Sequence, residues 1–380
     1  MIRIKFLTFI IIIFLCLNLT YADENTQHEY KIKNIDDLSR IKNDMDGNYI
    51  LMNDLDLNGS SWNSVGKGKF FEGVFDGNGK TLSNFTICGN DEENVGFFEY
   101  VGEQGIVKNT VLKDIKISGG YFAGCIAGYN KGSIENCHAI NVVVENKWGA
   151  GGLTGSSCGT IENCSFNGSV KSSNAGGITG INTGIIKMCY SDSNIEGEST
   201  AGGIAGMNFN KSIENIYALG TVKGGHYSGG ITGANYDGGK IEYAYTLNRI
   251  IGQNKAAGGI SGINKGYIEN CIAINDGIDG NINMGAQFPP FYVIFLKLIY
   301  GDESSVGCIT GGTDYDKIPT NCFSSNEIKT NKLYFNGFNG QKISKKEISE
   351  MFPTGIWNEW DKNIWKTNQT NLRLPVLIWQ

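Results

Sequence analysis

The sequence predicts an all-β protein, a single-stranded right-handed parallel β-helix with a short N-terminal helical cap and a C-terminal cap. First, a glycine-rich phrase such as "AGGITG" at 175 recurs from residue 95 to 306, in steps of 25 to 29 residues and a last step of 49; this spacing marks a solenoid. Second, each repeat holds three short β-type runs and no apolar stripe of helical period. Third, 53 glycines occur without a collagen period.

Equivalent residues of successive repeats are expected to form columns, because the strands of neighbouring rungs (single turns of the solenoid) lie about 4.8 Å apart. The glycines should avoid clashes between copies and reach positive φ at the corners. The apolar residue after each glycine pair should point inward, at roughly 1.5–3 kcal/mol each. This first column holds Leu153, Ile178, Ile204, Ile231 and Ile260. A second column holds Ile134, Ile161, Ile186, Ile213, Ile241 and Ile268. The right hand follows from the chirality of parallel crossovers.

Residues 1–22 have the features of a secretory signal peptide. Arg3 and Lys5 precede an apolar run from Phe6 to about Leu19, and a small residue closes the segment. We therefore expect a secreted or cell-surface protein without a transmembrane span after cleavage. The alternative is a retained anchor, although the run is shorter than the ~20 residues of a spanning helix.

Caps are expected at both ends because an open solenoid exposes strand edges. Residues 23–48 form the expected N-terminal capping segment, with a short helix over 34–45 and Asp36 as its N-cap. The apolar face of this helix holds Leu38, Ile41 and Met45. The β-helix then occupies 49–333, and the tryptophan-rich 334–380 form the C-terminal cap.

The longest step between repeats contains an apolar insertion at 287–303, "QFPPFYVIFLKLIYGDE". It is too short to span a membrane. It is expected to be a loop folded back over the flank, an inserted strand pair, or an exposed partner surface. The residues of this candidate partner surface are Phe288, Phe291, Tyr292, Phe295 and Tyr300.

Cysteines recur at one repeat position. Cys137, Cys164 and Cys189 should lie about 4.8 Å apart, within the Cα range of a disulfide. A ladder of buried free thiols, a disulfide and a metal site remain open. Only three histidines occur, without a C-x-x-C pair or an H-E-x-x-H zinc motif, so we expect no metal and no cofactor. His138 is expected to be solvated or hydrogen-bonded.

A charged column occupies another repeat position. Its members are Glu135, Glu162, Lys187, Glu214, Glu242 and Glu269. Lys187 should relieve repulsion between glutamates, which favours a solvated outer face over a sugar-binding or cation-binding stripe. Other acids are scattered, whereas a polysaccharide-cleaving enzyme needs clustered carboxylates.

Of two further polar columns, the asparagine column is interpreted as structural. Asparagines 136, 163, 215 and 270 should hydrogen-bond to their copies along the axis. Thr154, Thr179 and Thr232 share a position that Ala205 and Ser261 interrupt, which disfavours the regular threonine face of an ice-binding protein.

The phrase "AGGITGINTGIIKMCY" resembles the GLUG motif, a glycine-rich repeat of bacterial surface proteins and of the N-terminal region of immunoglobulin A peptidases, over about residues 46–326. The resemblance implies a β-helix on a secreted or surface protein, but no single activity. The net charge of −6 argues against nucleic acid or an anionic membrane as partner. We expect a non-catalytic protein that binds an extracellular glycan, host protein or envelope component. The alternative is a polysaccharide lyase or hydrolase.

Overall fold

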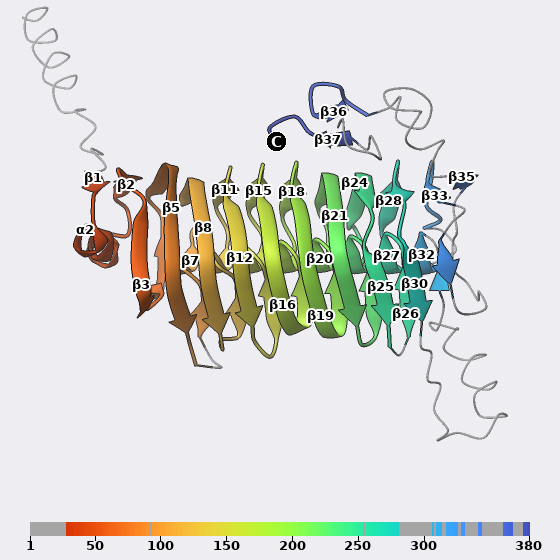
Figure 1. Cartoon of the computed structure of the whole chain (residues 1–380), viewed down its shortest axis with the longest axis horizontal. Coiled ribbons are helices and arrows are strands. Elements are labelled where there is room, and N and C mark those ends of the chain that lie inside the picture. The colour runs from red at the N-terminus through yellow and green to blue at the C-terminus, as the bar shows by residue number, and fades with distance from the viewer. Residues whose placement is uncertain are drawn as a thin grey trace, which may run out of the picture.

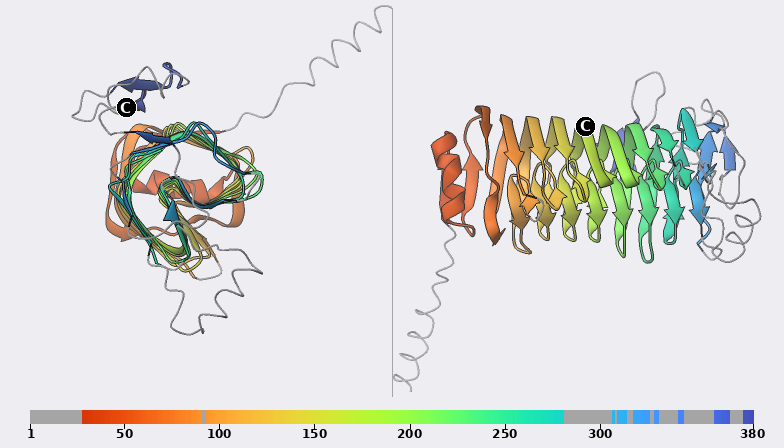
Figure 2. Two further views of the ribbon diagram at one scale, coloured as in Figure 1. Left: turned by 90° about the vertical axis from the view of Figure 1, so that its right-hand side faces the viewer. Right: turned by 90° about the horizontal axis from the view of Figure 1, so that it is seen from below.

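The computed structural model of the chain is a parallel β-solenoid that winds along one long axis (Figure 1). The structure describes residues 28–90, 93–253, 255–280, 306–307, 309–313, 317–325, 328–330, 341–343, 360–367 and 375–380. Seen along this axis, successive rungs lie over one another (Figure 2). The predicted parallel β-helix is confirmed.

Among the described residues, the strands of the rungs form two parallel sheets. The nine-stranded sheet holds β4 (Val65–Phe71), β7 (Phe98–Val101), β10 (Ala127–Asn130), β14 (Thr154–Ser157), β17 (Thr179–Asn182), β20 (Ala205–Asn208), β23 (Thr232–Asn235), β27 (Ser261–Asn264) and β32 (Thr310–Thr313). The 26-stranded sheet contains the strands β1 (Glu29–Ile32), β2 (Asn48–Leu51), β3 (Leu55–Ser61), β5 (Val74–Cys88), β8 (Ile106–Ser118), β12 (His138–Glu145), β16 (Ser165–Gly176), β19 (Tyr190–Gly202), β21 (Ser212–Gly224), β24 (Lys240–Thr246), β25 (Arg249–Gly252), β30 (Gly277–Gly280) and β34 (Lys329–Thr330). Its other strands are β6 (Asn94–Val95), β9 (Phe122–Ala123), β11 (Ser133–Glu135), β13 (Gly149–Gly151), β15 (Thr160–Glu162), β18 (Ile185–Lys187), β22 (Tyr227–Gly229), β26 (Ala256–Gly258), β28 (Tyr267–Glu269), β29 (Ile272–Ala273), β31 (Val306–Gly307), β33 (Phe323–Ser325) and β35 (Gln341–Ile343).

Both predicted apolar columns lie in the core. The Ile178 N–H donates to the Ile204 carbonyl at 2.8 Å, and the Ile204 N–H donates to the Ile231 carbonyl at 2.9 Å. In the second column, Ile134 pairs with Ile161, and the pairing continues through to Ile268. All members are buried. Isoleucine suits these positions because a β-branched side chain packs well on a pleated surface.

The glycine pairs are needed because backbones of successive rungs approach closely. A Cβ on Gly177 would lie 2.1 Å from the Gly203 carbonyl oxygen, and one on Gly203 would lie 2.2 Å from that of Gly230. The prediction that these glycines take positive φ at the corners is wrong. Eight of the positive-φ residues instead form another column, made of Asn109, Asn136, Asn163, Met188, Asn215, Tyr243, Asn270 and Asn321. Asparagine is common there because its short polar side chain tolerates the left-handed region.

The N-terminal end is covered by a short α-helix, α2 (Ile35–Ser39), continued by a 3-10 helix, η1 (Arg40–Asn43). Leu38 and Ile41 are fully buried in the solenoid core, and Met45 packs beside them, as predicted. Strand β1 precedes α2 and pairs in parallel with β2, so the stack of strands begins within the predicted capping segment.

The N-cap differs from the prediction. The Asn34 side chain accepts a hydrogen bond from the Asp37 N–H at 2.9 Å, which makes Asn34 the N-cap. Asp36 lies inside the first turn of α2 instead, where a carboxylate interacts favourably with the helix dipole. Asparagine and aspartate are both common N-cap residues, and they stand two positions apart here. The helix begins directly after Asn34, so Asn34 takes the N-cap position.

The described residues of the predicted C-terminal cap lie in two places. Strand β35 pairs with β33 and extends the stack. Strands β36 (Trp365–Thr367) and β37 (Pro375–Leu377) form an antiparallel hairpin beside the flank near β18, β21 and β24 (Figure 1). There Trp365 and Leu377 are buried with Tyr217 and Tyr245. We call residues 360–367 and 375–380 the C-terminal strap, since they bind along the flank and not across the last rung.

Two predicted segments, the signal peptide at 1–22 and the apolar insertion at 287–303, lie outside the described residues. The five aromatic residues of the candidate partner surface belong to that insertion and are likewise not described. Within the described ranges, no helix is both long and apolar enough to cross a membrane.

Candidate binding site

Six aromatic residues, Phe70, Tyr100, Tyr129, Phe122, Tyr121 and Trp148, form a continuous run that we call the aromatic flank. It begins on the nine-stranded sheet, where Phe70, Tyr100 and Tyr129 occupy paired positions of β4, β7 and β10. Their ring centroids are 5.0 and 6.3 Å apart. From Tyr129 the run passes to Phe122 at 6.4 Å and from Phe122 to Tyr121 at 4.7 Å. Stacking of rungs therefore aligns Phe70, Tyr100 and Tyr129 along the axis, and from Tyr129 the run crosses the same rung to Phe122 and Tyr121.

The line ends in an exposed pair. The rings of Tyr121 and Trp148 are stacked at 5.5 Å and 20°. Their exposed fractions are 44% and 47%, large values for rings of this size. The Asn174 N–H donates to the Trp148 carbonyl at 3.0 Å, so Ser173 stands beside Trp148 in the next rung.

The other end of the aromatic flank adjoins a cavity of about 820 Å³. Its lining includes Phe70 and three cations, Lys42, Lys67 and Lys69. Lys67 and Lys69 belong to a bulge of β4, because Val65 pairs with Phe98 but Phe70 pairs with Tyr100, and the extra residues loop out between them. Bulges of this kind re-aim side chains at the edge of a sheet.

A second cavity of about 620 Å³ shares Asn63, Ser64 and Lys67 with the first, and its lining reaches Tyr100. Glu93 also lines it, and the Glu93 carbonyl accepts the Tyr121 N–H at 2.6 Å. The two cavities and the aromatic flank are therefore contiguous. Together they form a surface on which an extended ligand could lie along several rungs.

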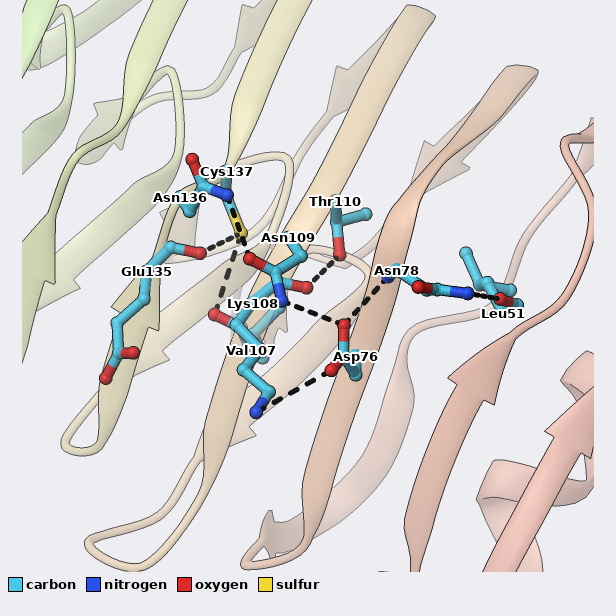
Figure 3. Close-up of polar contacts among 10 residues, drawn as sticks. All are labelled: Leu51, Asp76, Asn78, Val107, Lys108, Asn109, Thr110, Glu135, Asn136 and Cys137. Atoms are coloured by element: carbon cyan, nitrogen blue, oxygen red, sulfur yellow. Dashed lines mark hydrogen bonds and ion pairs between the residues drawn. The ribbon is translucent and has the colours of Figure 1, made fainter. Parts of the chain in front are cut away.

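The charged column lies on another face and matches the prediction. The register pairs Glu162 with Lys187 and Lys187 with Glu214, and the Lys187 ammonium lies 2.9 Å from the Glu162 carboxylate. The column continues toward the N-terminus with Lys108 and Asp76, whose charged groups are 3.6 Å apart (Figure 3). All of these side chains are partly solvated. The column is a partly solvated outer face in which Lys108 and Lys187 each lie between two acids.

The cysteine column consists of free thiols, and the ladder interpretation is confirmed. Cys137, Cys164 and Cys189 are buried and unbridged. The Cys137 N–H donates to the Cys164 sulfur at 3.4 Å, and the Cys137 thiol donates to the Glu135 carbonyl at 3.2 Å (Figure 3). Burial raises the pKa of the Cys137 and Cys164 thiols well above the ordinary value. These sulfurs are structural groups and not nucleophiles.

The remaining polar candidates are also structural. Over the described ranges, no group of three or more His, Cys, Asp or Glu residues could hold a metal ion. His138 is hydrogen-bonded to Ser165 at 3.0 Å, as expected, and stacks on Trp379. Burial lowers the pKa of His138. Thr154 and Thr179 are fully buried, so their column faces the interior and cannot bind ice.

The predicted asparagine ladder is present in part. Asn136 donates to the Asn109 side chain at 2.8 Å, and Asn109 donates to Asp76 at 3.0 Å (Figure 3). Asn215 instead accepts a hydrogen bond from the Trp365 indole at 3.0 Å. Asn215 therefore also anchors the C-terminal strap.

Sequence reasoning missed the aromatic flank. A usable signal was present, because Tyr121 and Trp148 are separated by about one repeat length, as are Tyr100 and Tyr129. The predicted columns contained aliphatic, cysteine, charged, asparagine and threonine residues, but no aromatic ones. The exposed aromatic residues of the early rungs were never aligned with one another.

The chain is a parallel β-solenoid with an exposed aromatic flank, and comparisons with known proteins leave its family open. No family model matches the chain. Halomucin of Haloquadratum walsbyi is 29% identical over 148 residues, which is 34% of this chain. A protein of Evansella cellulosilytica, named provisionally as a Gly-rich membrane protein, is 30% identical over 122 residues, or 29% of this chain. The chain spans only 2% and 14% of the lengths of these two relatives.

Two solved structures are similar to the chain. A candidate immunoglobulin A1 protease from Bacteroides ovatus has a TM-score of 0.46 at 22% identity, with 93% of each chain covered. A structure described as an IgA1 protease has a TM-score of 0.48 at 18% identity, over 82% of this chain and 22% of that one. At these identities and scores, neither likeness carries a conclusion about activity.

Proposed function

We propose that this chain is a secreted or cell-surface β-helix protein that binds a polysaccharide along the aromatic flank without cleaving it. The observation that carries the proposal is the stacked Tyr121–Trp148 pair, exposed by 44% and 47% at the end of a line of rings. Grouped exposed apolar residues mark interaction surfaces, whereas single ones do not. The C–H faces of sugar rings pack on the electron-rich faces of tyrosine and tryptophan.

Binding without cleavage is favoured by where the carboxylates lie. Glu162 and Glu242 belong to the charged column and pair with Lys187 and Lys240 at 2.9 and 2.7 Å. A glycosidase instead needs one acid protonated in an apolar site and a second acid across the scissile bond. Similarity to halomucin and to a membrane protein supports the extracellular location.

Affinity electrophoresis of the full chain through gels containing dextran, xylan or alginate tests the proposal. We expect retardation by at least one polymer, and its loss in the double variant Tyr121→Ala/Trp148→Ala. The matched control is Tyr267→Ala, which removes a ring with 47% exposure from β28, outside the aromatic flank. Equal retardation of the wild-type and double-variant chains, or new reducing ends in any polymer, would contradict the proposal.

A further inference from the structure

We propose that the cavity lined by Lys42, Lys67 and Lys69 binds the carboxylate or sulfate groups of an anionic polysaccharide, whose next sugar rings lie along the aromatic flank. This inference rests on the proposed function and names the ligand class. It starts from the β4 bulge, from unpaired cations and from the continuity of the cavities with the line of rings.

The β4 bulge has a strained backbone, and it places two lysines in the wall of the cavity. Lys67 has φ of 46° between Gly66 at 132° and Gly68 at 79°. The Gly68 N–H donates to the Glu99 carboxylate at 2.6 Å, which holds the bulge against β7. A lysine in the left-handed region is unfavourable and persists only where the surroundings impose it. The result of this strain is that Lys67 and Lys69 line the cavity.

The three lysines lack counter-ions. Among the ion pairs of the described residues, none involves Lys42, Lys67 or Lys69. The Lys42 ammonium lies 4.6 Å from the centre of the Trp62 ring. Burial, and then the charge of Lys67, lower the pKa of Lys42. Two like charges this close to one another are the arrangement that a bound anion would stabilise.

Two acids, Asp44 and Asp46, line this cavity beside the three lysines, and Glu99 lines the second cavity. The Asp44 carboxylate accepts the Tyr30 hydroxyl at 3.0 Å and the Asp46 N–H at 3.2 Å. Glu99 holds the bulge through Gly68. A further cation, Lys131, lies 5.0 Å from the centre of the Phe70 ring. The cations thus surround the point where the aromatic flank begins, although the whole chain has a net charge of −6.

The geometry points to a saccharide and not to a free ion. The second cavity connects the lysines with Tyr100, from which the rings continue to Trp148. Rungs repeat about every 4.8 Å, close to the length of one sugar residue. Successive residues of a charged sugar chain could therefore lie over successive rungs.

Isothermal titration of the full chain with alginate, heparin and dextran tests the inference. We expect alginate or heparin to bind at least about tenfold more tightly than dextran. The preference should fall about tenfold in Lys67→Gln/Lys69→Gln, since each exposed charge pair contributes modestly. It should also weaken when NaCl rises from about 0.05 to about 0.5 M, because salt screens exposed charges. Lys42→Gln is a second, independent variant.

The matched control is Lys116→Gln/Lys171→Gln, which removes two exposed lysines from β8 and β16 and should bind like wild type. Equal affinity of wild type and the bulge variant for alginate and heparin would overturn the inference. So would displacement of the polymer by sodium sulfate alone at matched ionic strength, which indicates a plain anion site. If dextran binds as tightly as alginate and binding is lost in Tyr121→Ala/Trp148→Ala, the proposed function stands and only this inference fails. If no polymer binds, both fail.

Discussion

In several rungs, a small buried side chain at the same corner donates a hydrogen bond to the backbone carbonyl two residues earlier. The thiols of Cys137 and Cys164 donate to carbonyls two residues earlier, at 3.2 and 3.0 Å. One rung before, the Thr110 hydroxyl makes the same contact with the Lys108 carbonyl at 2.8 Å (Figure 3). Cysteine is used as a small buried donor, which explains why the sulfurs are unbridged although the spacing would permit a disulfide.

The burial of these thiols predicts their reactivity. In the native chain, iodoacetamide should label the exposed Cys88 and Cys158, but not Cys137 or Cys164, because burial hinders access and raises the pKa of both thiols. Peptide mass mapping identifies the labelled residues, and the same reaction in urea is the control. Rapid native labelling of Cys164 would contradict the ladder.

The raised pKa of Tyr129 predicts that the folded protein loses stability at alkaline pH. Partial burial, with the hydrogen bond to Cys158, raises the pKa of Tyr129 to about 12 from 10.0. The folded state therefore holds the phenol proton more tightly than the unfolded chain does. This contribution to stability is complete below pH 10 and is lost as the pH rises from 10 to 12. Urea unfolding across this range should show a smaller loss in Tyr129→Phe than in wild type, and equal losses would refute the assignment.

At the scale of elements, the N-terminal cap gives a direct test between two residues. Replacing Asn34 by alanine removes the hydrogen bond to the Asp37 N–H and should cost about 1 kcal/mol of unfolding free energy. Asp36→Ala is the matched control and should cost less, since Asp36 only interacts with the helix dipole. Urea denaturation measures both, and a larger loss in Asp36→Ala would restore the original prediction.

The C-terminal strap is held by its tryptophans. The Trp365 indole donates to Asn215 at 3.0 Å, and the Trp379 indole donates to the Met188 carbonyl at 3.1 Å. Trp365→Ala should release the strap, because Trp365 is 1% exposed and fills the cluster around Tyr217 and Tyr245. We expect faster proteolysis within 360–380 and an unchanged far-ultraviolet β signal. Loss of that signal would show that the strap is part of the folding core.

A buried polar ladder stabilises the nine-stranded sheet. The Asn182 side chain donates to Asn208 at 2.7 Å, Asn208 donates to Asn235 at 2.8 Å, and Asn235 donates to Asn264 at 2.8 Å. All four are fully buried. The side-chain N–H of each asparagine donates to the side-chain oxygen of the next one, so the ladder fixes the register of the strands without leaving these donors unpaired. This ladder is distinct from the predicted one, whose asparagines lie at the positive-φ corners.

For the molecule as a whole, the repeat made the fold predictable. Like positions such as Ile178 and Ile204 must stack if the period is constant, and they do. The N-cap was less predictable because Asn34 and Asp36 have similar preferences. The strap was unpredictable in position, since a tryptophan-rich tail is equally able to cover an end or a flank. Which aromatic residues meet outside the core depends on the path of each turn, as with Phe122 and Tyr129 on different sheets.

The same reasoning explains why the candidate site was hidden. Lys67 and Lys69 lie in a bulge that interrupts the repeat, so no column contains them. Bulges and exposed rings are departures from the pattern, and a pattern search passes over them. In this solenoid the regular positions build the scaffold, and the irregular ones of the first rungs form the surface that we assign to binding.

The most direct test of the account is hydrogen exchange of the full chain with and without alginate, read by mass spectrometry. The account predicts slower exchange at 66–70, 119–123 and 146–149, which carry the β4 bulge, Tyr121 and Trp148, and no change around Glu162 and Lys187. Protection centred on the charged column, or alginate shortened during the experiment, would contradict it.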